Sequence, residues 1–148
     1  MIYLIGGAPR CGKSTLCQRF AAELGIGWIS TDLVVEVIDQ AGIKKPQQWD
    51  ARPEVVRDCA DQFFPYFERI VSGINSTAES YVIEGVHFLP NHVRTLHERF
   101  PIRAVFLGCS LITPADIARL PGKSPGYADL PKPMRAQIAR DVPVWSAW

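Results

Sequence analysis

The sequence has no long apolar run, no paired cysteines and almost no net charge. No apolar stretch approaches the length of a membrane span, and there is no internal repeat or low-complexity tract. The formal net charge of +1 provides no broad basic surface, which argues against bulk nucleic-acid binding. The four cysteines form no CxxC pair, so reduced thiols are expected rather than disulfides or zinc ligands. We therefore expect a cytoplasmic protein without a membrane partner.

A chain of 148 residues with 47% apolar and 21% charged side chains is typical of one globular domain. Short apolar runs of β-type composition predict strands at residues 2–5, 27–30, 80–83 and 103–108. Helical patterns separate these runs, and such alternation predicts a three-layer α/β fold, with a parallel sheet covered by helices on both faces. The ligand of such a sheet binds beyond the carboxyl ends of the strands.

Apolar residues three or four positions apart predict helices at about residues 13–24, 33–41, 52–74, 90–100, 113–119 and 133–141. Pro65 lies inside the longest of them and is expected to kink or break it. The aromatic residues around it are expected in the core rather than on an acceptor-binding platform: Phe63, Phe64, Tyr66 and Phe67. Residues 42–50 and 120–133 have the composition of loops.

Residues 7–14 match the phosphate-binding loop pattern GxxxxGK[ST], between a predicted strand and a predicted helix. Its glycines let backbone N–H groups turn toward phosphate oxygens, and the start of the helix adds positive potential. Lys13 would reach the outer phosphates, and Ser14 would bind the Mg²⁺ that accompanies a nucleotide. The predicted nucleotide-binding residues are Gly7, Ala8, Pro9, Arg10, Cys11, Gly12, Lys13, Ser14 and Thr15.

Cys11 lies within this loop, immediately before the predicted helix. A helix N-terminus lowers the pKa of a thiol, so oxidation of Cys11 could block the phosphate site. The favoured interpretation is that a small side chain simply fills the loop.

Two carboxylates follow the second and third predicted strands. Asp32 could cap the next helix, accept the proton of a substrate hydroxyl, or hold a water on the metal. Glu84 could bind Mg²⁺ or hold the substrate, and its alternative is a solvated strand end. His87 could line an acceptor pocket or be a partly buried structural histidine. His92 and His97 are five residues apart, the wrong spacing for two ligands on one helix face, and are given no role.

The loop at 7–15, the strand ends at 29–32 and 82–87, and the arginine-bearing segment after the fourth strand resemble those of the small P-loop kinases. This group includes nucleoside monophosphate kinases, shikimate kinase and chloramphenicol phosphotransferase, and residues 83–87 also resemble 2-phosphoglycerate kinases. The resemblance implies a P-loop nucleoside triphosphate hydrolase fold that uses ATP, Mg²⁺ and a small-molecule acceptor.

The resemblance also implies a lid over about residues 113–141, within a single kinase-like domain at 1–148. Arg119 would be its arginine, stabilising the transferring phosphoryl group, with Lys123, Arg135 and Arg140 as competitors. Arg57 lies on the helix that flanks the acceptor pocket in the family and could bind an acidic substrate.

The predicted function is an ATP-dependent phosphotransferase that moves the γ-phosphate to a small hydroxyl- or phosphate-bearing acceptor. Lys13, Asp32 and Arg119 are its predicted catalytic residues, and Asp32, Arg57, Glu84 and His87 its predicted substrate-binding residues. The alternatives are a nucleotide-binding module without turnover and a simple nucleotide hydrolase. No guanine-reading NKxD pattern is present.

The family carries a fifth strand beyond the lid, and this sequence ends where that strand should begin. Three explanations stay open: the sequence is truncated, residues 144–148 pack as a short stub, or a second subunit completes the edge in a homodimer.

Overall fold

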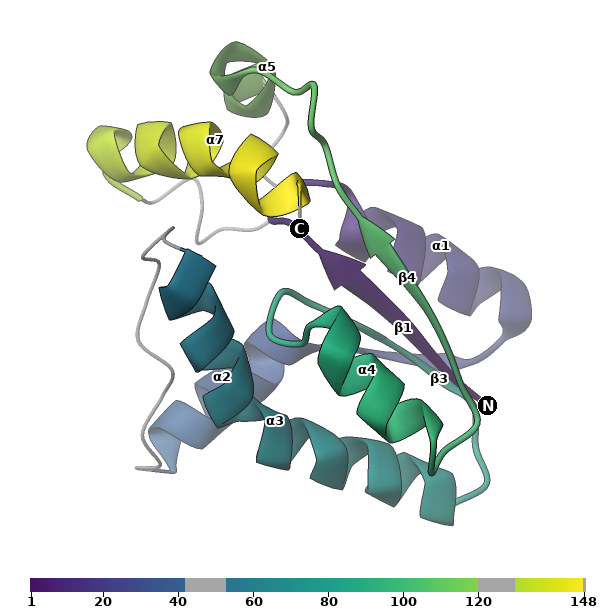
Figure 1. The fold of residues 1–148 in the computed structure, drawn as a ribbon. Helices are drawn as coiled ribbons and strands as arrows, with labels where there is room; N and C mark the ends of the chain where they lie inside the picture. The colour runs from purple at the N-terminus through teal and green to yellow at the C-terminus, as the bar shows by residue number, and fades with distance from the viewer. Residues whose placement is uncertain (42–52, 120–129, 148) are drawn as a thin grey trace.

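The computed structural model describes residues 1–41, 53–119 and 130–147, and these contain one parallel sheet of four strands. The strands are β1 (Ile2–Gly7), β2 (Gly27–Ser30), β3 (Tyr81–Glu84) and β4 (Ile102–Leu107), in the order β2-β3-β1-β4 (Figure 1). All neighbouring pairs are parallel. The four predicted strands and the α/β fold class are therefore confirmed.

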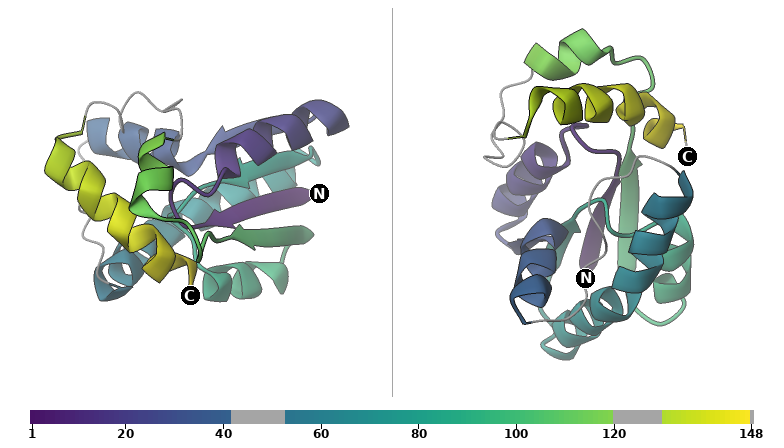
Figure 2. Two further views of the ribbon diagram at one scale, coloured as in Figure 1. Left: turned by 90° about the horizontal axis from the view of Figure 1, so that it is seen from above. Right: turned by 90° about the vertical axis from the view of Figure 1, so that its left-hand side faces the viewer.

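Helices cover both faces of this sheet. Tyr3 and Ile5 of β1 pack in the cluster that includes α1 (Lys13–Leu24), whereas Ile2 and Leu4 pack against the other helices. Those other helices are α2 (Thr31–Gln40), α3 (Pro53–Ser76) and α4 (Pro90–His97). Successive side chains of a strand point to opposite faces, so β1 is buried on both sides between helical layers (Figure 2).

The largest core cluster contains a stack of phenylalanine rings. Phe67 lies parallel to Phe88 with ring centroids 4.7 Å apart, and Phe63 stacks on Phe67 at 6.2 Å. All three side chains are buried. The prediction that the aromatic residues near Pro65 belong to the core is confirmed.

Several predicted helix boundaries were wrong. Ser30, and not Asp32, caps α2, because the Ser30 hydroxyl accepts a hydrogen bond from the Asp32 N–H at 3.3 Å. Asp32 instead lies in the first turn of α2. α3 continues through Pro65 and is bent part-way along its length (Figure 1), so of the two predicted outcomes the helix is kinked rather than broken.

The last helix, α7 (Lys132–Ser146), also extends beyond its predicted end at residue 141 and contains Pro143. Residues 144–146 form its last turn, so the described part of that tail is not a strand stub. Its end lies close to β4, because a Cβ built on Gly108 would come within 3.0 Å of Ser146.

Two helices lie beyond the carboxyl ends of β1 and β4 (Figure 2): α7 and the short α5 (Pro114–Arg119). Ile138, Ala139 and Val142 of α7 pack against Ala8, which follows β1. Thr113 and Asp116 form a reciprocal cap of α5. The loop predicted at 42–50 lies outside the described residues, and so do residues 120–129 of the loop predicted at 120–133. The end of that second loop was wrong, because α7 already begins at Lys132. Within the described part, no helix is long and apolar enough to cross a membrane.

Replacement of Phe67 by alanine should lower the free energy of unfolding by about 3–5 kcal/mol, because it leaves a cavity in the ring stack. Leu111→Ala is the matched control, since Leu111 is 94% exposed and its loss should change stability by less than about 0.5 kcal/mol. Urea unfolding followed by circular dichroism measures both. Equal stability of the two variants would contradict this core assignment.

Candidate active site

The loop between β1 and α1 turns sharply beside β4. Gly7 has φ +122°, and a Cβ there would lie 2.0 Å from the Leu107 carbonyl oxygen, so only glycine fits. The Ala8 N–H donates to that same oxygen at 3.0 Å. Arg10 and Gly12 also have positive φ, at 64° and 82°. These conformations curl the backbone of residues 7–12 back toward the start of α1.

The N-terminus of α1 is suited to an anion. Gly12 is the N-cap and offers no side chain to the first N–H groups, and the first turn contains no acidic residue. Nothing lies within 4 Å of the position that a Cβ would take at Gly12, so a ligand can come close to the backbone. The unpaired N–H groups and the helix dipole together favour a phosphate here.

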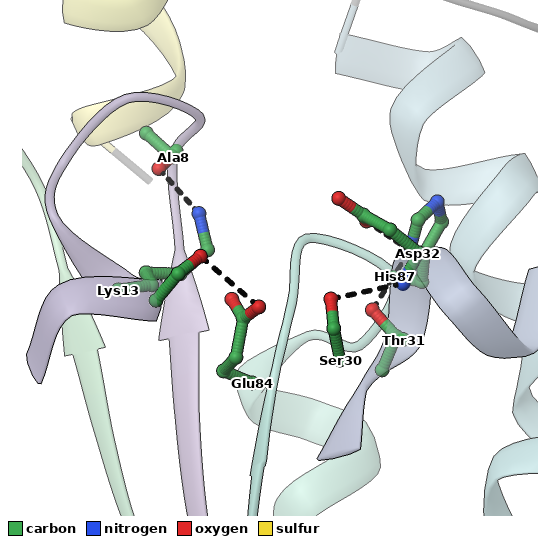
Figure 3. A network of polar contacts seen from close by, with 8 residues as sticks. Ala8, Lys13, Ser30, Thr31, Asp32, Glu84 and His87 are labelled. Carbon is green, nitrogen blue, oxygen red and sulfur yellow. Dashed lines mark hydrogen bonds and ion pairs between the residues drawn. The ribbon is translucent and has the colours of Figure 1, made fainter. Parts of the chain in front are cut away.

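Lys13 lies inside the loop with only 7% of its surface exposed. Its ammonium donates to the Ala8 carbonyl oxygen at 2.8 Å (Figure 3). Burial lowers the pKa of Lys13, while the nearby Glu84 carboxylate opposes that change. The lysine therefore brings positive charge to the place where the loop N–H groups converge.

Glu84 at the end of β3 faces the start of α1. The Ser14 hydroxyl donates to the Glu84 Oε1 at 3.1 Å, and Glu84 is only 4% exposed. The parallel register that pairs Ile5 with Glu84 creates this contact. Three features together identify the fold. They are the GxxxxGK[ST] pattern of residues 7–14, the turn beside β4, and the Glu84 carboxylate on the neighbouring strand.

The chain has the P-loop fold. Its Ser14 and Glu84 supply only oxygen donors, which is the chemistry that Mg²⁺ prefers. Within residues 1–41, 53–119 and 130–147, no three His, Cys, Asp or Glu side chains gather as a metal site. A P-loop Mg²⁺ typically takes one or two protein oxygens and completes its shell with phosphate and water, so this donor set fits.

A second polar group lies at the same edge of the sheet, where α2 begins. The His87 Nδ1 is 2.9 Å from the Thr31 hydroxyl and 3.6 Å from the Asp32 Oδ1. Gly85 permits this approach, because a Cβ there would lie 1.7 Å from the Thr31 Oγ1. Burial, and secondarily the charge of Lys13, lower the pKa of His87 to about 4, so its ring is neutral at pH 7.

Asp32 faces the P-loop group across the edge of the sheet (Figure 3). Its side chain is 71% exposed, yet the surrounding protein displaces enough water to raise the pKa of its carboxyl. Lys13 lowers that pKa and Glu36 raises it further. The charge of Lys13 thus acts on both Asp32 and His87, which couples the two polar groups.

The predicted arginines lie on helices other than those that supply these groups. Arg119 is the exposed last residue of α5, and its positive charge lowers the pKa of Asp116 on the same helix. Arg57 lies on an exposed part of α3. Of the competing cations, Arg140 donates to Gln137 of α7 at 2.6 Å, and Lys123 lies outside the described residues.

Cys11 is not an activated thiol, which agrees with the interpretation that a small side chain fills the loop. Burial, and then the adjacent Cys109 thiol, raise the pKa of Cys11 to about 11. These effects outweigh the hydrogen bond with Ser146 and the charge of Lys13, which both lower this pKa. Cys11 also lies 3.9 Å from the Ser146 hydroxyl at the end of α7.

Sequence reasoning missed two structural contacts at this edge. The first involves Thr31, which is fully buried. Its only signal in the sequence is Gly85, whose missing Cβ lets the chain pass against Thr31. His92 donates from Nε2 to Asp61 at 2.7 Å and accepts the Leu89 N–H at 3.3 Å. It therefore fastens the start of α4 to α3, a role that spacing alone did not reveal.

No protein-family model matches the chain, and no curated protein matches its sequence. Solved structures that are similar to it are described as kinases. One, from Chloroflexus aurantiacus J-10-fl, is provisionally assigned as a kinase; it is 22% identical over 72% of this chain and 58% of its own, with a TM-score of 0.49. This chain thus spans less than two thirds of that protein.

Two further solved structures are each 15% identical with a TM-score of 0.46. A gluconokinase from Sinorhizobium meliloti 1021 matches over 95% of this chain and 73% of its own. A shikimate kinase from Aquifex aeolicus VF5 matches over 99% and 81%. The solved structures similar to this chain therefore include the shikimate kinase type named by the sequence resemblance.

Alkylation of Cys11 in the folded protein should be slow at pH 7–8. A pKa raised from 9.0 to about 11 implies a thiolate population about a hundredfold below that of an ordinary cysteine. Iodoacetamide labelling followed by peptide mass spectrometry measures this, with the urea-unfolded protein as control. If Cys11 were the fastest native thiol at pH 7, its raised pKa would be contradicted.

Proposed function

We propose that the chain is an ATP- and Mg²⁺-dependent phosphotransferase that moves the γ-phosphate to a small acceptor. The observation that supports this best is the presence of two coupled polar groups at one edge of the sheet. Lys13, Ser14 and Glu84 form the first, and Asp32 and His87 belong to the second. A nucleotide hydrolase needs only the first, whereas a kinase also needs a place for the acceptor.

The nucleotide phosphates would bind the N–H groups at the start of α1. Lys13 would exchange its bond to the Ala8 carbonyl for a phosphate oxygen, since a charge-assisted bond to phosphate is stronger than one to a carbonyl. Ser14 and Glu84 would hold Mg²⁺, which would neutralise charge on the phosphates. The remaining loop residues 7–12 and Thr15 would line the phosphate site.

The acceptor would lie between Asp32 and the phosphates. Asp32 would orient the attacking hydroxyl and receive its proton, because its carboxylate is exposed and points toward the P-loop group (Figure 3). Transfer would be in-line and direct, with catalysis by positioning and electrostatics. Glu84, His87 and Arg57 are the further candidates for acceptor binding.

Arg119 would stabilise the transferring phosphoryl group from a lid over about residues 113–141. α5 and α7 lie over the carboxyl end of β1, as a cover requires (Figure 2). We expect residues 1–148 to act as one kinase-like domain in the cytoplasm. A homodimer formed along β4 is one of the explanations that stay open for the exposed edge of the sheet.

ATP consumption by the purified protein should depend on an added acceptor. The screen would comprise nucleosides, nucleoside monophosphates, sugar acids, and aminoglycoside- or phenicol-like alcohols. Asp32→Asn should lower kcat about 10²–10⁴-fold while ATP affinity stays within about twofold, because a general base acts on transfer and not on nucleotide binding. Asp39→Asn, two turns further along α2, is the control.

Other outcomes would separate the alternatives. Turnover without any acceptor would identify a hydrolase, and tight ATP binding without turnover would identify a binding module. Equal loss of ATP affinity and transfer in Asp32→Asn would reject the role of Asp32.

A further inference from the structure

We propose that the His87 Nε2 selects the acceptor by accepting a hydrogen bond from one of its hydroxyl or amino groups. The chemical class is a polyhydroxylated or amino-alcohol acceptor, with one hydroxyl at Asp32 and a neighbouring donor at His87. An acceptor that presents a phosphate or carboxylate at His87 is excluded. This inference rests on the proposed function and names its acceptor class.

The His87 ring carries one proton at pH 7. Burial and the positive charge of Lys13 both disfavour the doubly protonated form, which lowers its pKa to about 4. One ring nitrogen is therefore a donor and the other a bare acceptor. The ring packs 5.4 Å from Phe63 and is held by the contact to Thr31, so its orientation is fixed.

The surroundings of Nδ1 favour the proton on that nitrogen. The Thr31 hydroxyl at 2.9 Å can accept its hydrogen bond, and the Asp32 carboxylate oxygen at 3.6 Å can only accept. The opposite tautomer would set the lone pair of Nδ1 against the Asp32 oxygen. Thr31 is buried and lies close to Gly85, so its side chain has little room to turn away from the ring.

The second nitrogen is then a bare acceptor. Among the described residues, no protein group pairs with the His87 Nε2, and 20% of the side chain is exposed. In Figure 3 this nitrogen points away from Thr31, in the direction in which β1 runs. A phosphate or carboxylate oxygen would meet its lone pair, whereas a hydroxyl or amino group would donate to it.

The charges around His87 act in the same direction. Asp32 lies beside the ring, and Glu36 on the next turn of α2 adds negative charge that raises the pKa of Asp32. An anionic group at this point would be repelled by both carboxylates. The positive charge of Lys13 lowers the pKa of His87, but Lys13 would be paired with the nucleotide phosphates.

The tautomer can be read by NMR on the full, nucleotide-free chain. Long-range ¹H–¹⁵N spectra at pH 7 should show a protonated Nδ1 and a bare Nε2 for His87. The chain has three histidines, so His87→Gln and His97→Gln assign the signals. Thr31→Ser keeps the hydroxyl and should keep this tautomer, whereas Thr31→Val should shift the population toward Nε2–H. A protonated Nε2 in the unaltered chain would overturn the proposal.

Acceptor selection is measured with matched pairs: an alditol against its aldonic acid, and a nucleoside against its monophosphate. The uncharged member should be the better acceptor, and His87→Ala should raise its KM about tenfold with the KM for ATP unchanged. His97→Ala, on the exposed side of α4, should change neither.

The outcomes separate this inference from the proposed function. A preference for the anionic member, or an acceptor KM unchanged in His87→Ala, would overturn acceptor selection by His87 and leave a kinase. Absence of turnover with every acceptor would overturn both the proposed function and acceptor selection by His87. The NMR measurement of the His87 tautomer does not depend on turnover and would still give its result.

Discussion

The pairing of β1 with β3 is the constraint on which both the core and the site depend. Its register sets Ile5 opposite Glu84, and the Gly85 N–H extends the ladder by donating to the Ile5 carbonyl at 3.2 Å. A slip of one residue would turn the buried side chains of β3 to the wrong face and move Glu84 away from Ser14. Stability and site geometry therefore come from one set of backbone hydrogen bonds.

The loop after β3 carries this constraint to the start of α2. Because Gly85 has no Cβ, the chain passes directly against Thr31 and brings His87 beside Asp32. The buried charge of Lys13 reaches this group as well, since it lowers the pKa of both Asp32 and His87. Phosphate bound at Lys13 would offset that influence, so occupancy of the proposed nucleotide site would alter the electrostatics around Asp32 and His87.

Local pattern was sufficient for the strands, for α1 and for the phosphate-binding loop, because their residues act on near neighbours along the chain. The cap of α2 was misjudged because Ser30 and Asp32 both suit that position, and only the backbone path decides between them. The pKa of Cys11 depends on Cys109, and the Thr31–His87 contact joins residues 56 positions apart. Such contacts are set by packing between distant segments, which periodicity does not report.

β4 is the edge strand next to β1, and packing decides which part of it is covered. The last turn of α7 lies over Gly108 and Cys109, whose N–H donates to the Ser146 hydroxyl at 2.8 Å, so the end of this helix covers the carboxyl end of β4. The middle of β4 is left exposed, with Val105 at 46%. An exposed strand edge can pair with another strand, and the charge of Arg103 on this one opposes non-specific pairing. The end of α7 therefore covers β4 at its carboxyl end, whereas the outer edge of β4 is the surface on which a further strand or subunit could pair.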